Sequence, residues 1–178
     1  MGYLEEQLGR FVPQETVPYL VGLLNRHRTE LKIVKDRKTK QGDYRPPQNG
    51  ISYHRISINR GLNPYAFVIT LVHEFAHLET WIKYERRVKP HGPEWKQTFK
   101  ELMAPVLALG VFPQPVIQAL AQYLIHPKAS SCSDPQLYRV LSQYNKEAAI
   151  HLESLPMGSH FRLYNGRVFE KQQKKRTR

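Results

Sequence analysis

The stretch "TLVHEFAHLETW" at residues 70–81 constrains this chain more than any other, because it places His73, Glu74 and His77 in the spacing H-E-x-x-H. In an α-helix, residues four apart lie on one face, so the two imidazoles can reach a single ion. Glu74 is turned by about 100° from His73 and can take a proton from a water molecule at that ion. The pattern predicts a helix that carries a metal site, although so short a pattern also arises by chance.

The residues around the motif favour a helix with two different faces. Asn63 suits the N-cap and Pro64 the first position, so we expect a helix from residue 64 to about residue 86. With Leu71 at 0°, the large apolar side chains fall within about 60° of it and the histidines near 200° and 240°. We therefore expect the histidines to lie opposite the core. Small residues on their side would leave room for a cleft: Ala66, Ala76 and Thr80.

A catalytic metal site needs a third protein ligand and an open position. The extended pattern H-E-x-x-H-x-x-G-x-x-H is excluded, because Thr80 and Lys83 occupy the positions of its glycine and third histidine. His91 in "VKPHGPEW" is the favoured third ligand, since the prolines and glycine around it predict a turn back toward the helix. Two carboxylates are the alternatives: Glu94 and Glu101.

Other segments carry signals for helices and strands. Strands are expected at 31–36 and 50–58, with a short third strand around 43–45. Asn165-Gly166 predicts a C-terminal β-hairpin with a two-residue turn. Further helices are expected at 16–27 with Thr16 as N-cap, at 93–110 with a kink at Pro105, at 113–124 and at 134–149.

The chain is strongly basic, with a net charge of +12 and a pI near 9.9 over 178 residues. Such an excess is typical of proteins that bind a polyanion, although a soluble basic protein is the simpler interpretation. One basic cluster lies between the predicted ligands, and it is either a solvated helix end or a rim that faces DNA. That cluster comprises Lys83, Arg86, Arg87 and Lys89.

A second basic cluster ends the chain and can contact nucleic acid as well. It comprises Lys171, Lys174, Lys175, Arg176 and Arg178. The rest of the chain stays basic without it, with 22 basic and 15 acidic residues.

The motif "TLVHEFAHLETW", the segment "HGPEW" fourteen residues after His77 and the preceding strand "HRISIN" together resemble the SprT-like, or Spartan-type, family of zinc metalloproteases. The resemblance extends from about residue 31 to residue 102. It implies one catalytic Zn²⁺ bound by His73, His77 and His91, with Glu74 as the catalytic acid/base. A departure from many bacterial members is the absence of a four-cysteine zinc ribbon, since Cys132 is the only cysteine.

The resemblance also implies an α+β fold, a zincin-like metalloprotease domain whose small β-sheet packs on the active-site helix. We expect this domain at 1–128, and a helix, the hairpin and the basic tail at 129–178. The implied function is a metalloendopeptidase in DNA repair, acting on DNA-associated or DNA-crosslinked proteins, with single-stranded or damaged DNA as a partner. The alternative is a non-enzymatic nucleic-acid-binding module with a structural zinc.

The expected compartment is intracellular and cytoplasmic, with no membrane partner. The N-terminus "MGYLEEQLGRF" has glutamates where a signal peptide would be basic and then apolar. Apolar runs such as "APVLALGVF" are too short to span a bilayer. A single cysteine fits a reducing compartment.

Overall fold

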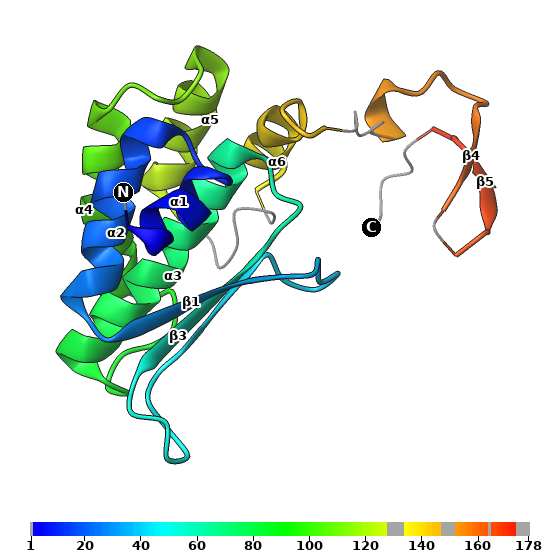
Figure 1. Ribbon diagram of the computed structural model, residues 1–178. Coiled ribbons are helices and arrows are strands. Elements are labelled where there is room, and N and C mark those ends of the chain that lie inside the picture. The colour runs from blue at the N-terminus through cyan, green and yellow to red at the C-terminus, as the bar shows by residue number, and fades with distance from the viewer. Residues whose placement is uncertain (1, 128–133, 147–151, 164, 174–178) are drawn as a thin grey trace. The chain divides into compact units, whose positions relative to one another are not determined.

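The computed structural model describes residues 2–127, 134–146, 152–163 and 165–173 (Figure 1). The fold is α+β, as expected. The chain forms two compact units, Met1–Lys146 and Glu147–Arg178. The expected division into domains at 1–128 and 129–178 stays a prediction. None of the described helices is long and apolar enough to cross a lipid bilayer.

The first unit contains a three-stranded sheet with the strand order β1-β3-β2. Its strands are β1 (Thr29–Val34), β2 (Gly42–Arg45) and β3 (His54–Asn59). The central β3 runs parallel to β1 and antiparallel to β2, with Tyr44 opposite Ile56. The predicted third strand near residues 43–45 is thus confirmed.

Helices cover the sheet and supply most of the core. They are α1 (Tyr3–Gly9), α2 (Val17–Arg26), α3 (Pro64–Tyr84), α4 (Pro93–Ala108), α5 (Gln114–Ile125) and α6 (Pro135–Ser142). Short 3₁₀ turns add Gln14–Thr16 and Leu152–Ser154. Helix α3 packs against β2 and β3 and also against α4, so it lies between the sheet and α4 (Figure 1).

Helix α3 begins as the sequence predicts. The Asn63 side chain accepts a hydrogen bond from the Ala66 amide at 3.0 Å, and Pro64 is the first helical residue. The helix ends at Tyr84, where Glu85 takes a left-handed backbone with φ 53°. Together these boundaries position both histidines of the motif in the middle of the helix.

The prediction that the histidines lie opposite a one-sided core is wrong. Every residue from 66 to 76 is buried, and His73 is only 8% exposed. The sheet covers one side of α3 and α4 covers another, so the helix has almost no solvated face. An isolated helical wheel cannot show a second layer of structure.

Two further local predictions hold only in part. Thr16 is the N-cap residue of α2, but its side chain does not cap the helix, because its hydroxyl donates to the Pro13 carbonyl at 2.6 Å. The helix expected at 134–149 ends at Ser142, where Asn63 donates to the carbonyl of Leu141 at 2.8 Å.

The second unit holds the predicted hairpin, formed by β4 (His160–Arg162) and β5 (Val168–Glu170). Its turn differs from the expected one: Leu163 pairs with Arg167, so three residues rather than two connect the strands. The Gly166 amide donates to the Leu163 carbonyl, and Gly166 has φ 82°. A turn followed by a left-handed glycine is the usual form of a three-residue hairpin loop.

Candidate metal centre

Three histidine side chains converge in the first unit. The Nε2 atom of His77 lies 3.2 Å from that of His73 and 2.9 Å from that of His91. The Nε2 atoms of His73 and His91 are 3.3 Å apart. Over the described ranges, these residues form the one group of three or more potential ligands close enough to share an ion.

The chemistry of these three nitrogens suits a cation. Zn–N bonds of about 2.0–2.1 Å in tetrahedral geometry separate the nitrogens by roughly 3.3 Å, close to the distances observed. Burial lowers the pKa of His73 well below its ordinary value and that of His77 to about 3, and it also lowers the pKa of His91. Neutral imidazoles keep lone pairs, so the site is prepared to bind a metal ion.

The alternative third ligands do not join this group. Glu101 is exposed on α4, where its carboxylate accepts a hydrogen bond from Gln97 at 2.8 Å. Glu94 lies in the first turn of α4, outside the group of converging ligand atoms. Of the three candidates for the third ligand, only His91 lies next to the two histidines of α3.

A short connection between α3 and α4 positions His91. His91 has a left-handed backbone with φ 58°, and the next residue, Gly92, donates from its amide to the Lys89 carbonyl at 2.9 Å. Gly92 then caps α4, and Pro93 is its first residue. The predicted turn at "KPHGP" is therefore present and carries His91 back to α3.

Trp95 forms the floor under the three histidines. Its ring centroid lies 4.6 Å from His73, 5.3 Å from His77 and 4.7 Å from His91. On another side it stacks on Phe99 at 5.2 Å, and it is fully buried. We did not identify Trp95 from the sequence, although a tryptophan one helical turn after a candidate ligand was a usable signal.

Glu74 is buried beside this centre, with 6% of its surface exposed. Its pKa is raised to about 8, chiefly by burial and also by the nearby carboxylate of Asp43. Arg37, Lys40 and a hydrogen bond from the Tyr44 backbone act in the opposite direction. A carboxyl group with a pKa near neutrality can exchange protons at physiological pH.

Strand β2 approaches Glu74 so closely that only glycine fits at position 42. A Cβ atom on Gly42 would lie 2.3 Å from the Glu74 Oε1 atom and 2.8 Å from the Thr70 Cγ2 atom. We did not predict this close approach from the sequence. A glycine inside a strand often marks the close approach of another group, and that signal was present.

Tyr44 and His54 form a polar pair on the same side of the sheet. The Tyr44 hydroxyl is hydrogen-bonded to the His54 Nδ1 atom at 2.9 Å. Burial raises the pKa of Tyr44 and lowers that of His54, which favours the neutral form of both groups. His54 also contacts the Trp81 ring edge-on at 5.4 Å.

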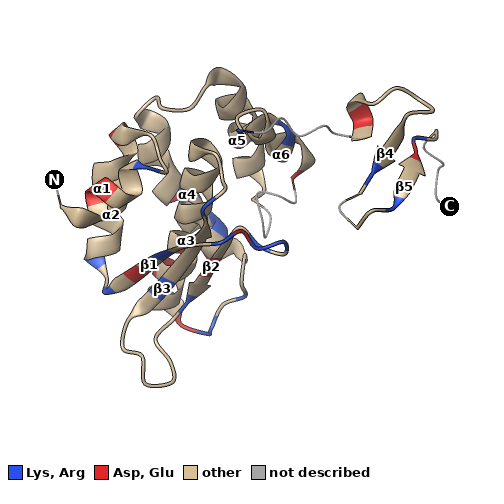
Figure 2. Ribbon diagram, turned by 45° about the vertical axis from the view of Figure 1, so that its right-hand side comes forward, with Lys and Arg blue, Asp and Glu red and all other residues tan. Residues whose placement is uncertain are grey.

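The structure describes only some of the residues that we predicted to contact nucleic acid. The cluster of Lys83, Arg86, Arg87 and Lys89 is exposed at the end of α3 and in the following loop. Arg86 lines a pocket together with His77, so this cluster lies near the histidines. Lys174, Lys175, Arg176 and Arg178 lie outside the described residues. Basic residues occur on several loops, with acidic residues among them (Figure 2).

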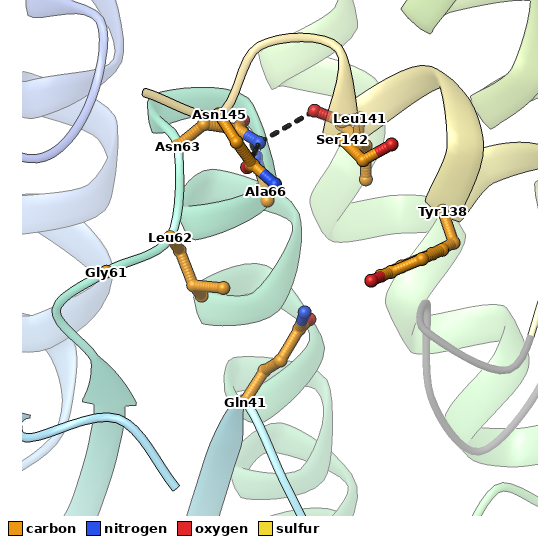
Figure 3. A pocket seen from close by; sticks show the side chains of 9 residues that line it. All are labelled: Gln41, Gly61, Leu62, Asn63, Ala66, Tyr138, Leu141, Ser142 and Asn145. Carbon is orange, nitrogen blue, oxygen red and sulfur yellow. Dashed lines mark hydrogen bonds between the residues drawn. The ribbon is translucent and has the colours of Figure 1, made fainter. Parts of the chain in front are cut away.

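A separate polar hollow of about 130 Å³ lies at the other end of α3 (Figure 3). The Asn63 amide donates there to the Leu141 carbonyl and to the Asn145 side chain, both at 2.8 Å. None of the three histidines lines this hollow. Its hydrogen bonds join α3 to α6 and stabilise the fold.

Comparison with known protein families gives a match to the SprT-like family over residues 12–114. The matched region contains the whole sheet, α3 and α4, and therefore all three histidines and Glu74. Neither the comparison with curated proteins nor the one with solved structures finds a match.

Proposed function

Because the chain belongs to the SprT-like family, we propose that it is a zinc-dependent endopeptidase that acts on DNA-associated or DNA-crosslinked proteins. The observation that carries the proposal is the convergence of three neutral imidazoles within 3.3 Å of one another, next in sequence to a buried glutamate. The family is generally linked to metallopeptidase-type activity.

His73, His77 and His91 would hold the ion. Three imidazole nitrogens are a common ligand set for catalytic zinc, and three protein ligands leave a position open for water or substrate. Bound zinc supplies Lewis-acid chemistry, polarising a carbonyl oxygen and making water more acidic. We propose Zn²⁺ as the ion on this basis.

Glu74 would transfer the protons of the reaction. Its carboxylate accepts a proton from the attacking water and then donates a proton to the amine that leaves the cleaved peptide bond. The hydrogen bond from the Tyr44 amide orients the carboxylate, and the absence of a side chain at Gly42 leaves space for it. Burial excludes bulk water and keeps the carboxyl pKa near neutrality.

We also propose that the fold is of the zincin-like type. Its support is the packing of β2 and β3 on the helix that carries the motif, together with a third ligand from the next connection. Two residues that contact Glu74 or its partners, Gly42 and Tyr44, come from the edge strand β2.

The DNA partner, whether single-stranded or damaged, and a cytoplasmic location are proposals as well. The net charge of +12 and exposed basic residues near His77 support the DNA partner. Counterion release from phosphates would make any such binding strongly dependent on salt.

The first test is the substitution Glu74→Gln. The variant should retain about one zinc ion per chain and lose proteolysis, because the amide cannot accept the proton that the carboxylate takes. Zinc content by metal analysis and cleavage of an unfolded protein with and without single-stranded DNA provide the measurements.

Glu79→Gln on the same helix is the matched control, since Glu79 contacts Arg26 and His27 instead of the metal ligands. Undiminished cleavage by Glu74→Gln would remove Glu74 from the mechanism. A wild-type protein that binds zinc and DNA but cleaves nothing would favour the nucleic-acid-binding module with a structural zinc.

A further inference from the structure

A hollow of about 470 Å³ lies along the loop that joins β1 to β2. Three cationic side chains of this loop line it: Arg37, Lys38 and Lys40. Four residues line both this hollow and the polar hollow of Figure 3: Gln41, Gly61, Leu62 and Tyr138. The two hollows therefore adjoin, and we call them together the basic groove.

The guanidinium group of Arg37 is held in place without being neutralised. It donates to the side chains of Asn59 and Ser57, both at 2.9 Å. It also donates to the carbonyl oxygens of Gln41 at 3.3 Å and of Ser57 at 3.1 Å. All four acceptors are neutral, and within the described part of the chain Arg37 makes no ion pair. A fixed cation that no carboxylate neutralises favours the binding of an anion such as a phosphate.

The remaining charges of the wall leave it positive. Asp36 is its one acidic residue among those described, and the Asp36 carboxylate accepts from the Gly61 amide at 2.8 Å. Lys40 pairs with Asp43 at 2.7 Å, whereas Lys38 is exposed on the loop. Positive charge therefore exceeds negative charge even where Lys40 is counted as neutralised, and the groove attracts an anion.

Tyr138 adds an aromatic ring to this wall. It belongs to α6, is 42% exposed and points toward Leu62 and Gln41 across the groove (Figure 3). Nucleobases stack on exposed aromatic rings that lie beside cationic side chains for the phosphates. The bases of a duplex are already paired and stacked, so a base that reaches Tyr138 belongs to a single strand.

We propose that the basic groove binds single-stranded DNA, with a phosphate at Arg37 and Lys38 and a neighbouring base on Tyr138. This site rests on the proposed function, because DNA is the partner named there. It is separate from the cluster of residues 83–89 and from the C-terminal tail.

The groove lies close to the proposed general base. Gln41 lines both hollows, and its side-chain oxygen accepts from the hydroxyl of Thr70, one helical turn before Glu74, at 3.4 Å. The next residue of the loop, Gly42, lies directly against Glu74. DNA bound in the groove would hold a protein attached to it next to the helix that carries the histidines.

Binding is measured apart from cleavage in the full-length Glu74→Gln protein, by fluorescence anisotropy with a labelled dodecamer of deoxythymidine. Adding Tyr138→Ala should weaken binding about tenfold, because the stacking of one base is lost. Tyr138→Phe should bind like the parent protein, because the ring remains. Tyr3→Ala is the matched control, since Tyr3 is 80% exposed and does not line the groove.

Lys38→Gln tests the phosphate contact, because Arg37 also holds the loop on the sheet. It should weaken binding and lower the log–log salt slope by at most about 0.7, the value for one phosphate of a single strand. Arg10→Gln is the control, since it removes one charge from an exposed residue outside the groove and should leave the slope unchanged. A dodecamer that carries 5-iodouracil should crosslink to Tyr138 on irradiation, as located by mass spectrometry.

The outcomes separate this site from the proposed function. Parental affinity in folded Tyr138→Ala and Lys38→Gln variants, checked by thermal unfolding, would overturn the groove and leave the DNA partner in place. Crosslinks confined to residues outside the groove would do the same. Competition by oligoglutamate as strong as that by the dodecamer would overturn the site for DNA in favour of an acidic peptide. A parent protein that binds no DNA would overturn both the groove and the DNA partner, whereas cleavage without DNA by the wild type tests the peptidase function alone.

Discussion

Gly42 lies directly against Glu74, the residue that we propose as the general base. A side chain at this position would overlap with the Glu74 carboxylate and the Thr70 methyl group. The backbone of β2 therefore touches the proposed general base directly, and any displacement of the strand changes the environment of Glu74.

Gly42→Ala should accordingly destabilise the protein by about 1–3 kcal/mol, the usual cost of adding a group to a filled space. Proteolysis should fall further than stability explains, because Glu74 must move, whereas zinc content should stay near one per chain. Urea unfolding, metal analysis and cleavage rates measure these effects.

Gly22→Ala is the matched control, since nothing lies within 4 Å of a Cβ atom at that exposed helical position. It should stabilise the protein by about 0.5–1 kcal/mol. If the wild type and Gly42→Ala are equally stable, β2 does not lie in close contact with Glu74.

The titration of the buried site gives a prediction for the metal-free protein. Burial lowers the pKa of all three histidines, so below about pH 6.5 the unfolded chain binds more protons and stability should fall as the pH falls. The pKa of Glu74 is raised to about 8, so its effect on stability has the opposite sign. The stability that protonated Glu74 contributes is present at low pH and disappears as the pH rises from about 4.5 to 8.

The metal-free protein should therefore be most stable near pH 6.5. Above that pH, stability should decline by at most about 1.4 kcal/mol per pH unit until Glu74 has ionised. Urea unfolding from pH 5 to 9 in the presence of a chelator measures the curve. In Glu74→Gln the decline above pH 6.5 should disappear, and its persistence would contradict the assignment to Glu74.

At the scale of elements, the connection from α3 to α4 supplies His91, the third proposed ligand. We predict that His91→Ala lowers zinc affinity by two orders of magnitude or more, because two imidazoles alone form an incomplete site. Glu94→Gln and Glu101→Gln should leave the affinity nearly unchanged. Competition with a chromophoric chelator measures all three variants, and loss of zinc from a glutamate variant alone would contradict the role of His91.

The sequence predicts those elements whose signals are local. The N-cap of α3, the turn before α4 and the alternation in β3 each depend on neighbouring residues, and the structure has all three. The burial of the histidine face and the approach of Gly42 to Glu74 depend on packing between segments about 30 residues apart. No single stretch of sequence specifies such packing.

The same distinction explains the smaller errors. Thr16 has the right chemistry for an N-cap, yet the preceding 3₁₀ turn uses its hydroxyl. The helix after Asp134 has enough apolar spacing to continue, yet Asn63 binds the carbonyl of Leu141 near its end. In both cases a hydrogen bond from another segment or turn outweighs a weak local preference.

At the scale of the whole molecule, the positive charge predicts a dependence on salt. Lys171 donates to the carbonyls of Glu153 and Leu155 inside the second unit, so a test of the tail should begin after residue 173. Deleting residues 174–178 should weaken DNA binding and flatten its salt dependence. For each phosphate that the tail no longer neutralises, the log–log slope should change by at most about 0.9 for duplex DNA or about 0.7 for single strands. Peptidase activity without DNA should persist.

Neutralising Lys83, Arg86, Arg87 and Lys89 should instead reduce DNA-stimulated cleavage more than DNA affinity, because this cluster lies beside the pocket near His77. DNA affinity at several salt concentrations and cleavage rates with and without DNA compare the two variants. If both variants keep the DNA affinity and the salt slope of the wild type, the basic residues of these two clusters serve solubility and not DNA binding.

The backbone of His91 implies a trade-off between durability and function. A left-handed conformation costs a residue with a side chain roughly 1–2 kcal/mol, and glycine would remove this penalty. In the absence of metal, selection for heat resistance would thus favour glycine at position 91, whereas the proposed metal site requires the imidazole. A library screened for thermal tolerance in the presence of a chelator would drift toward more stable proteins that hold no ion.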